Sequence, residues 1–179
     1  IDTIKRVYAS TFYQSAKDYI RITTYRLEEE KMAVIVQRMV GTQHTNRYYP
    51  DFSGVAKSHN YYPIPPQRSA DGIVSVALGL GKTIVDGGNT VRFCPKYPKS
   101  TSYSSVKQVL QESQDGFYSL EMDHEPIAKT ETHDVLLVKH RLEDAESDDT
   151  LRWVGSTYSA ENEAIYDGLS RNGLRIVTF

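Results

Sequence analysis

The chain of 179 residues has one cysteine, nearly balanced charges and no apolar run of membrane-spanning length. A single cysteine, Cys94, excludes an internal disulfide and fits a reducing compartment, so we expect a cytoplasmic protein with a buried, inert thiol. A net charge of −2 supplies no field that would attract nucleic acid or an anionic membrane. Basic clusters with interleaved aromatics are also lacking, which argues against a nucleic-acid-binding module.

What is present is typical of a globular chain. Hydrophobic residues make up 39% and charged residues 25% of the sequence, enough to bury a substantial core in one domain or two small lobes. Thirteen tyrosines favour amphipathic packing at strand edges, with a stacking or carbohydrate-binding surface as the functional alternative.

The first part of the chain alternates between two periodicities. Apolar residues recur every three or four positions from Ile4 to Ile20, which predicts an amphipathic helix capped by Asp2 or Thr3. Residues 32–40 are rich in β-branched side chains and predict a buried strand. We interpret residues 41–52 as an exposed hairpin connection, after which residues 53–61 return as a strand paired with residues 32–40.

The remaining segments suggest short strands among turns and single helices, an α+β fold with a mixed or antiparallel sheet packed on helices. We expect strands at 53–61, 72–78, 90–93, 117–122, 135–142 (with a helix as the alternative), 151–158 and 173–179. A helical turn is expected at 82–86 and a helix at 105–111, whereas the prolines at 63, 65 and 66 exclude a helix there. The acidic run at 143–149 is interpreted as a solvated loop.

Several motifs suggest a phosphate loop, a phosphohistidine or a metal site, but the spacing or surroundings of their residues do not support these assignments. Gly81-Lys82-Thr83 lacks the glycine that a phosphate loop needs five residues earlier, where Val76 stands. His59 has no phosphohistidine context, and His44 is expected to be solvent-exposed, with a nucleotide phosphate contact as the alternative. Six further side chains match no compact metal pattern, so no metal ligand is predicted. These are Glu121, Asp123, His124, Glu125, Glu131 and His133.

Four short segments carry a family resemblance through their order and spacing. They are VIVQRMVG at 34–41, SGVA at 53–56, ALGLG at 77–81 and VDGG at 85–88. Together they resemble the nucleotide-binding domain of the phosphoenolpyruvate synthase / pyruvate phosphate dikinase family, which has an ATP-grasp fold. The resemblance runs along nearly all of residues 1–179, so we expect a single, partial ATP-grasp domain.

The resemblance implies an ATP-binding part of a phosphotransferase. The parent reaction would convert ATP, pyruvate and water to phosphoenolpyruvate, AMP and phosphate through a phosphohistidine in another domain. Adenine would contact Gln37, Arg38, Met39 and Val40, largely through backbone atoms, and Gly54 would face the phosphates. ATP and Mg²⁺ are the implied cofactors, with most metal ligands and phosphate clamps outside this chain.

Departures from the family pattern keep alternatives open. The family usually carries an acidic residue where this chain has Lys82, and both chain ends suggest a piece of a longer protein. We therefore expect no turnover and weak nucleotide binding from the chain alone, with a homodimer possible through an exposed apolar face. The alternatives are a related phosphotransferase with an antibiotic or glucan acceptor, and a degenerate module without catalysis.

Overall fold

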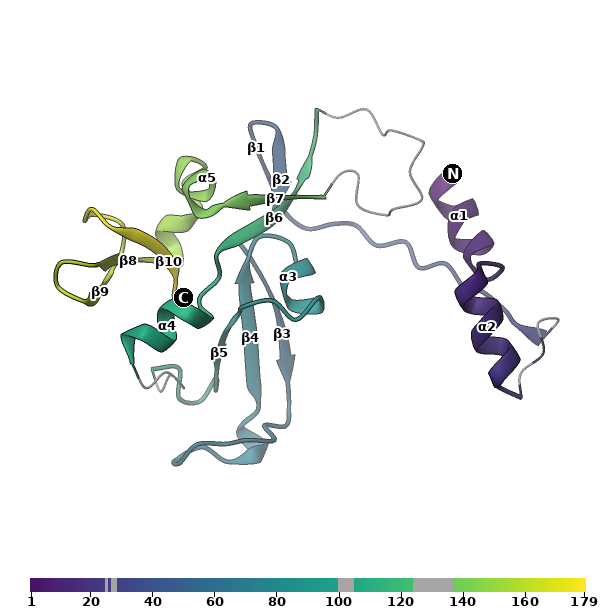
Figure 1. The fold of residues 1–179 in the computed structure, drawn as a ribbon, viewed down its shortest axis with the longest axis horizontal. Coiled ribbons are helices and arrows are strands. Elements are labelled where there is room, and N and C mark those ends of the chain that lie inside the picture. The colour runs from purple at the N-terminus through teal and green to yellow at the C-terminus, as the bar shows by residue number, and fades with distance from the viewer. Residues whose placement is uncertain (25, 27–28, 100–104, 124–136) are drawn as a thin grey trace. The chain divides into compact units, whose positions relative to one another are not determined.

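The computed structural model describes residues 1–24, 26, 29–99, 105–123 and 137–179, and the chain divides into two compact units (Figure 1). The first unit spans Ile1–Met39 and the second Val40–Phe179. Antiparallel strand pairs and short helices make up the second unit, which confirms the predicted α+β class. Among the described residues, no helix combines the length and apolar character that a membrane span requires.

The first unit contains two helices where the sequence predicted one. Helix α1 spans Asp2–Ser10 and α2 spans Gln14–Ile22. The Ser10 hydroxyl donates to the Val7 carbonyl at 2.7 Å, which is the local side-chain bonding that competes with helix continuation. The residue before α1 is Ile1, so the predicted cap by Asp2 or Thr3 is wrong.

The predicted buried strand at residues 32–40 is also wrong. The structure assigns no strand there, and Ile35 and Val36 are 82% and 79% exposed. β-branched composition predicts an extended backbone, and burial requires in addition a neighbouring strand to complete the ladder. This segment therefore presents apolar side chains outside any sheet.

The second unit is built from three antiparallel sheets (Figure 1). The first sheet has the order β1 (Thr42–His44), β2 (Arg47–Tyr49), β6 (Gly116–Glu121), β7 (Leu137–Arg141). The second has the order β3 (Phe52–Lys57), β4 (Ile73–Leu78), β5 (Val91–Phe93), and the third β10 (Leu174–Val177), β8 (Gly155–Ser159), β9 (Ala164–Asp167). The helices are α3 (Lys82–Val85), α4 (Val106–Glu112), α5 (Leu142–Ser147) and the 3-10 turns η2 (Ser69–Asp71) and η3 (Leu151–Trp153).

Many of the expected elements are confirmed, with shifted ends. β4, α3, β5, α4, β6 and β10 lie where the sequence predicted them, and the described part of 135–142 is the strand β7. The connection at 41–52 instead contains the β1–β2 hairpin, and the strand expected at 151–158 begins with η3. β9 was not predicted. β3 pairs with β4, so the interpretation that it pairs with residues 32–40 is wrong.

The core of the second unit joins its sheets through buried apolar side chains and one amide. Tyr49, Phe117 and Leu78 are fully buried in one cluster, and Cys94 is a free, buried thiol as predicted. The buried Gln114 side chain accepts from the Leu78 N–H at 2.8 Å and donates to the Leu78 carbonyl at 2.9 Å. Its amide thus supplies the last rung of the β4 ladder, where no further strand residue follows.

The acidic run at 143–149 is structural, and its interpretation as a solvated loop is wrong. Residues 143–147 of the run lie in α5, and the Asp148 side chain is 5% exposed. Arg47 donates to Asp148 from Nε at 2.9 Å and from Nη2 at 2.7 Å, a bidentate pair. The Tyr49 hydroxyl donates to the same carboxylate at 2.7 Å and lies 3.1 Å from the Thr150 hydroxyl. This carboxylate therefore ties β2 to the segment after α5.

The pKa values reflect these contacts. Burial raises the pKa of the Asp148 carboxyl, but the hydrogen bonds from Arg47 and Tyr49 outweigh it, so the pKa is lowered overall. Burial raises the pKa of the Tyr49 hydroxyl, which stays protonated as a donor. On α5, the hydrogen bond from Arg175 lowers the pKa of Glu146, which accepts two bonds of 2.8 and 2.7 Å from that guanidinium.

We expect Asp148→Ala to destabilise the protein by about 3–5 kcal/mol, because it leaves the mostly buried Arg47 charge and the Tyr49 hydroxyl without their acceptor. Urea denaturation would measure the loss. Glu143→Ala is the matched control on the same acidic run, since Glu143 is 59% exposed and pairs at 3.4 Å with an exposed arginine; its expected effect is below about 0.5 kcal/mol. Equal effects of the two substitutions would contradict the assigned role of Asp148.

Acid should remove the stabilisation that Asp148 and Glu146 provide. Both pKa values are lowered from ordinary values of 3.8 and 4.5, so the unfolded chain takes up these protons first as the pH falls. The contribution is complete above about pH 5 and is lost as the pH falls through the folded pKa values. Urea midpoints at about pH 6 and about pH 3 should therefore differ less for Asp148→Asn/Glu146→Gln than for the unmodified chain. An unchanged difference would mean that other groups control the acid response.

Candidate functional site

The residues predicted to contact adenine lie in the exposed segment that leads into the second unit. Gln37, Arg38 and Met39 end the first unit and Val40 begins the second. All four are exposed, with Met39 at 44% and Val40 at 79%. Main-chain recognition of a flat ring needs an accessible backbone, and this segment has one outside any strand.

Gly54 lies in the middle of β3, in the second unit. It stands opposite Val76 in the β3–β4 ladder. A Cβ at this position would lie 3.0 Å from the Ser75 carbonyl oxygen and 3.1 Å from Val76 Cγ1. Gly54 therefore allows β3 to lie close to β4. Packing against β4 is enough to explain why a small residue stands at this position, and no ligand is needed to explain it.

The Gly-Leu-Gly segment forms a tight connection between β4 and α3. Gly79 has a φ of +79°, and a Cβ there would lie 2.8 Å from the Tyr118 carbonyl oxygen. The Leu80 N–H donates to that same carbonyl at 2.9 Å, so the loop packs directly on β6. α3 then has only four residues, consistent with the rejection of a phosphate loop, whose phosphate lies at the start of a long helix.

Lys82 lies within this connection and has partners of its own. Its ammonium lies 3.0 Å from the Asp86 carboxylate, one helical turn later. It also lies 5.7 Å from the centre of the Tyr118 ring, within the range of a cation–π contact. Where the family usually has an acidic group, this chain therefore presents a cation held between an aspartate and an aromatic ring.

A cavity of about 160 Å³ opens beside α3 and β6. Its lining is polar or small: Thr83, Asp86, Gly87, Gly88, Asn89, Asp115, Gly116, Tyr118 and Lys139. Sites that enclose a drug-sized ligand measure about 300–1,000 Å³. The cavity is thus too small for a complete nucleotide, and Lys139 is paired across it with Asp115 at 3.0 Å.

The histidines take structural positions. His59 is exposed beside the Tyr61 ring, with 4.6 Å between ring centroids, as expected of an ordinary loop residue. His44 is half-buried with its ring 4.8 Å from that of Tyr49. Its Nε2 atom is buried and has no hydrogen-bond partner among the described residues. The expected solvent exposure of His44 is therefore wrong, and burial of Nε2 leaves a phosphate no access to that atom.

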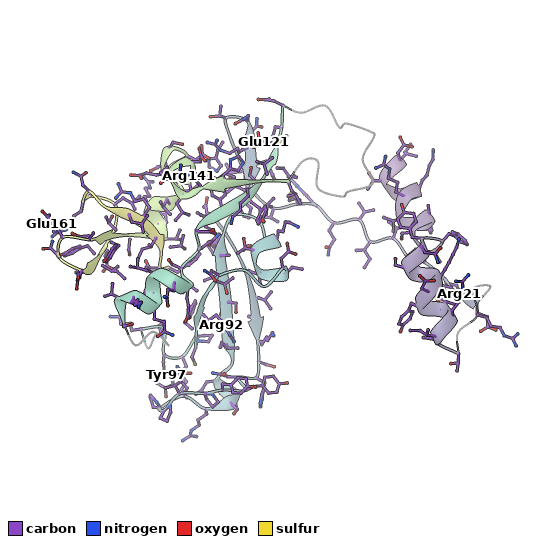
Figure 2. The ribbon with its side chains drawn as sticks, viewed as in Figure 1. Arg21, Arg92, Tyr97, Glu121, Arg141 and Glu161 are labelled. Atoms are coloured by element: carbon purple, nitrogen blue, oxygen red, sulfur yellow. The ribbon has the colours of Figure 1, made fainter. Side chains whose placement is uncertain are left out.

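A second buried polar group, at the end of β6, was not predicted from the sequence, where Glu121 was considered only as a metal ligand. Glu121 (labelled in Figure 2) is 8% exposed and accepts from the Asn46 amide at 2.9 Å. His140 Nε2 lies 2.9 Å from its other carboxylate oxygen. These residues are far apart in sequence and meet through the β2–β6 and β6–β7 pairings. Among the described residues, no three His, Cys, Asp or Glu side chains gather as metal ligands. His124, Glu125, Glu131 and His133 lie outside the described residues.

Comparison with known proteins defines the class. A family model described as "Pyruvate phosphate dikinase, AMP/ATP-binding domain" matches residues 1–161, so the chain is an AMP/ATP-binding domain of the kind found in phosphotransferases. It belongs to the pyruvate phosphate dikinase AMP/ATP-binding family, which confirms the resemblance seen in its motifs. No curated protein and no solved structure matches the chain.

The β4–α3 connection offers a test of local packing. Gly79 and Gly87 both have left-handed φ values, +79° and +74°, but a Cβ at Gly87 would meet nothing within 4 Å. Gly87→Ala should cost about 1–2 kcal/mol from backbone strain alone. Gly79→Ala should cost about 1–3 kcal/mol more, because the methyl group overlaps the Tyr118 carbonyl and the Phe117 ring. Chemical denaturation of both variants measures the difference, and equal losses would show that the loop does not pack on β6 as described.

Proposed function

We propose that this chain binds ATP as the nucleotide-binding part of a phosphoenolpyruvate-synthase-like phosphotransferase with an ATP-grasp fold, acting in the cytoplasm. The observation that carries the proposal is the family match over residues 1–161. The parent reaction would pass phosphate from ATP through a histidine in another domain to pyruvate. Transfer to an antibiotic or a glucan is the alternative that the nucleotide-binding domain alone does not distinguish.

The adenine site is proposed at Gln37, Arg38, Met39 and Val40, with Gly54 toward the phosphates. The exposure of this segment supports the assignment. The edge of an adenine ring forms hydrogen bonds with backbone N–H and C=O groups, and here no strand among the described residues pairs with those groups. Met39 supplies a polarizable thioether that can pack on an aromatic ring. Binding of the nucleotide would then order an otherwise unsupported segment of the chain.

Mg²⁺ accompanies ATP in phosphoryl transfer, where carboxylates and phosphate oxygens hold it. The described residues gather no cluster of three candidate ligands, so they do not fit a protein-built metal site. No described residue is therefore assigned to the metal.

A non-catalytic module is the second candidate, and Lys82 favours it. A lysine paired with Asp86 at 3.0 Å replaces the usual acidic side chain of the family. Such a domain would retain its fold while losing nucleotide chemistry. ATP binding separates the two candidates, because a degenerate interaction module need not bind it.

Isothermal titration with Mg-ATP tests the proposal on this chain. Weak binding is expected, and Met39→Asp should weaken it further, at least about tenfold, because it replaces the stacking thioether with a charge that repels phosphate. Met122→Asp is the matched control, since Met122 is 50% exposed against 44% for Met39 and lies outside the proposed site. Absence of heat with the unmodified chain would favour the degenerate module. Binding that Met39→Asp leaves intact would move the adenine site elsewhere.

A further inference from the structure

The last residue of the first family motif lies outside the proposed adenine contacts. Gly41 ends the stretch VIVQRMVG and directly follows Val40. Of the four proposed contacts, Val40 is the one that belongs to the second unit, which begins there. The planar peptide bond joins the Val40 carbonyl to the Gly41 nitrogen, so a contact that fixes Gly41 within the second unit also fixes that carbonyl.

Gly41 lies in close contact with strand β2. A Cβ at this position would lie 2.8 Å from the Tyr49 carbonyl carbon, 3.0 Å from the Tyr49 carbonyl oxygen and 2.9 Å from Cε1 of Tyr48. Two carbon atoms that share no bond are most stable at about 3.5–4.0 Å. A side chain at position 41 would therefore push the chain away from β2.

The part of β2 that Gly41 contacts is firmly held. Thr42, the next residue, stands opposite Tyr49 in the β1–β2 ladder. Tyr49 is fully buried in the core cluster, and its hydroxyl donates to Asp148 at 2.7 Å. A close-packed interior transmits strain rather than absorbing it. The displacement would therefore fall on the chain before Gly41, where Val40 is 79% exposed and lies outside any strand.

We propose that Gly41 is a positioning residue for the nucleotide base, whose lack of a side chain keeps the Val40 backbone where it can select adenine over guanine. Adenine presents an amino donor where guanine presents a carbonyl oxygen, so a backbone carbonyl that accepts from adenine faces another acceptor in guanine. Such a hydrogen bond needs a separation of about 2.9 Å, which a shift of the backbone would break. The role of Gly41 rests on the proposed binding of ATP at residues 37–40, because only a base bound there can be selected.

Gly41→Ala tests this role with three probes: Mg-ATP, Mg-GTP and Mg-tripolyphosphate, which carries phosphates without a base. Isothermal titration should find the Kd of Mg-ATP raised at least about tenfold, because the adenine contact is misplaced. The Kd values of the other two probes should change by less than about twofold, so that the preference for ATP over GTP falls. A purely structural role would not produce this pattern, since partial unfolding weakens all three probes equally.

Gly155→Ala is the matched control for crowding. Gly155 lies in β8 of the third sheet, and a Cβ there would lie 2.7 Å from the Leu151 carbonyl oxygen and 2.8 Å from Leu151 Cγ. The substitution crowds the backbone to a similar degree away from the base, so it should leave the preference for ATP over GTP unchanged.

Tyr49→Phe approaches the same contact from β2 and carries the test if Gly41→Ala does not fold. It keeps the buried ring but removes the hydroxyl bond to Asp148 that holds this part of β2. The Kd of Mg-ATP should rise at least about twofold, while that of Mg-tripolyphosphate stays the same. Circular dichroism establishes that each variant is folded before its titrations are compared.

Three results would overturn the role of Gly41. Mg-ATP binding that folded Gly41→Ala and Tyr49→Phe both leave unchanged would refute it while the proposed function stands. Equal weakening of all three probes would show that Gly41 supports the fold and does not position the base. Absence of Mg-ATP binding by the unmodified chain would overturn the proposed function and the role of Gly41 together.

Discussion

The Asp148 carboxylate is the constraint on which the arrangement of the second unit depends. It receives two bonds from Arg47 and one from the hydroxyl of the fully buried Tyr49. These contacts join residues about a hundred positions apart, a separation at which loop closure has a real entropic cost. A hydrophobic contact alone would tolerate sliding of the β1–β2 hairpin, whereas a bidentate pair with a third donor fixes its position.

Tyr49 connects this polar network to the apolar core. Its ring packs at 4.6 Å from Phe117, whose own ring lies 5.4 Å from His140. His140 in turn lies beside Glu121, which accepts from Asn46 in the β1–β2 turn. The first sheet therefore combines aromatic packing of Tyr49, Phe117 and His140 with the polar contacts of Glu121. Such mixed networks favour one arrangement because each polar group is costly if moved from its partner.

The sequence predicted what depends on local periodicity and missed what depends on distant partners. β4, α3, β5 and α4 were located because glycines, short apolar runs and a serine cap mark their ends. The acidic run was misread because composition alone describes Glu146 and Asp148 as solvated, whereas their partners Arg175 and Arg47 are known only after folding. Residues 32–40 were misread for the converse reason, since β-branched composition does not reveal whether a neighbouring strand is present.

Residues 32–40 and β3 both expose side chains of strand-forming type, such as Ile35, Val36 and Val55. The motifs on which the family resemblance rests include both stretches, VIVQRMVG and SGVA. Elsewhere in the second unit, β4 and β6 pair on both sides, and the buried Asp148 carboxylate accepts from three donors. Local rules and global packing agree in most of a stable protein, and the places where they disagree are where function is expected. An exposed strand-forming segment is costly to a chain that does nothing with it, because it invites unwanted pairing. The exposure of strand-forming side chains in both segments is therefore consistent with the binding role proposed for them.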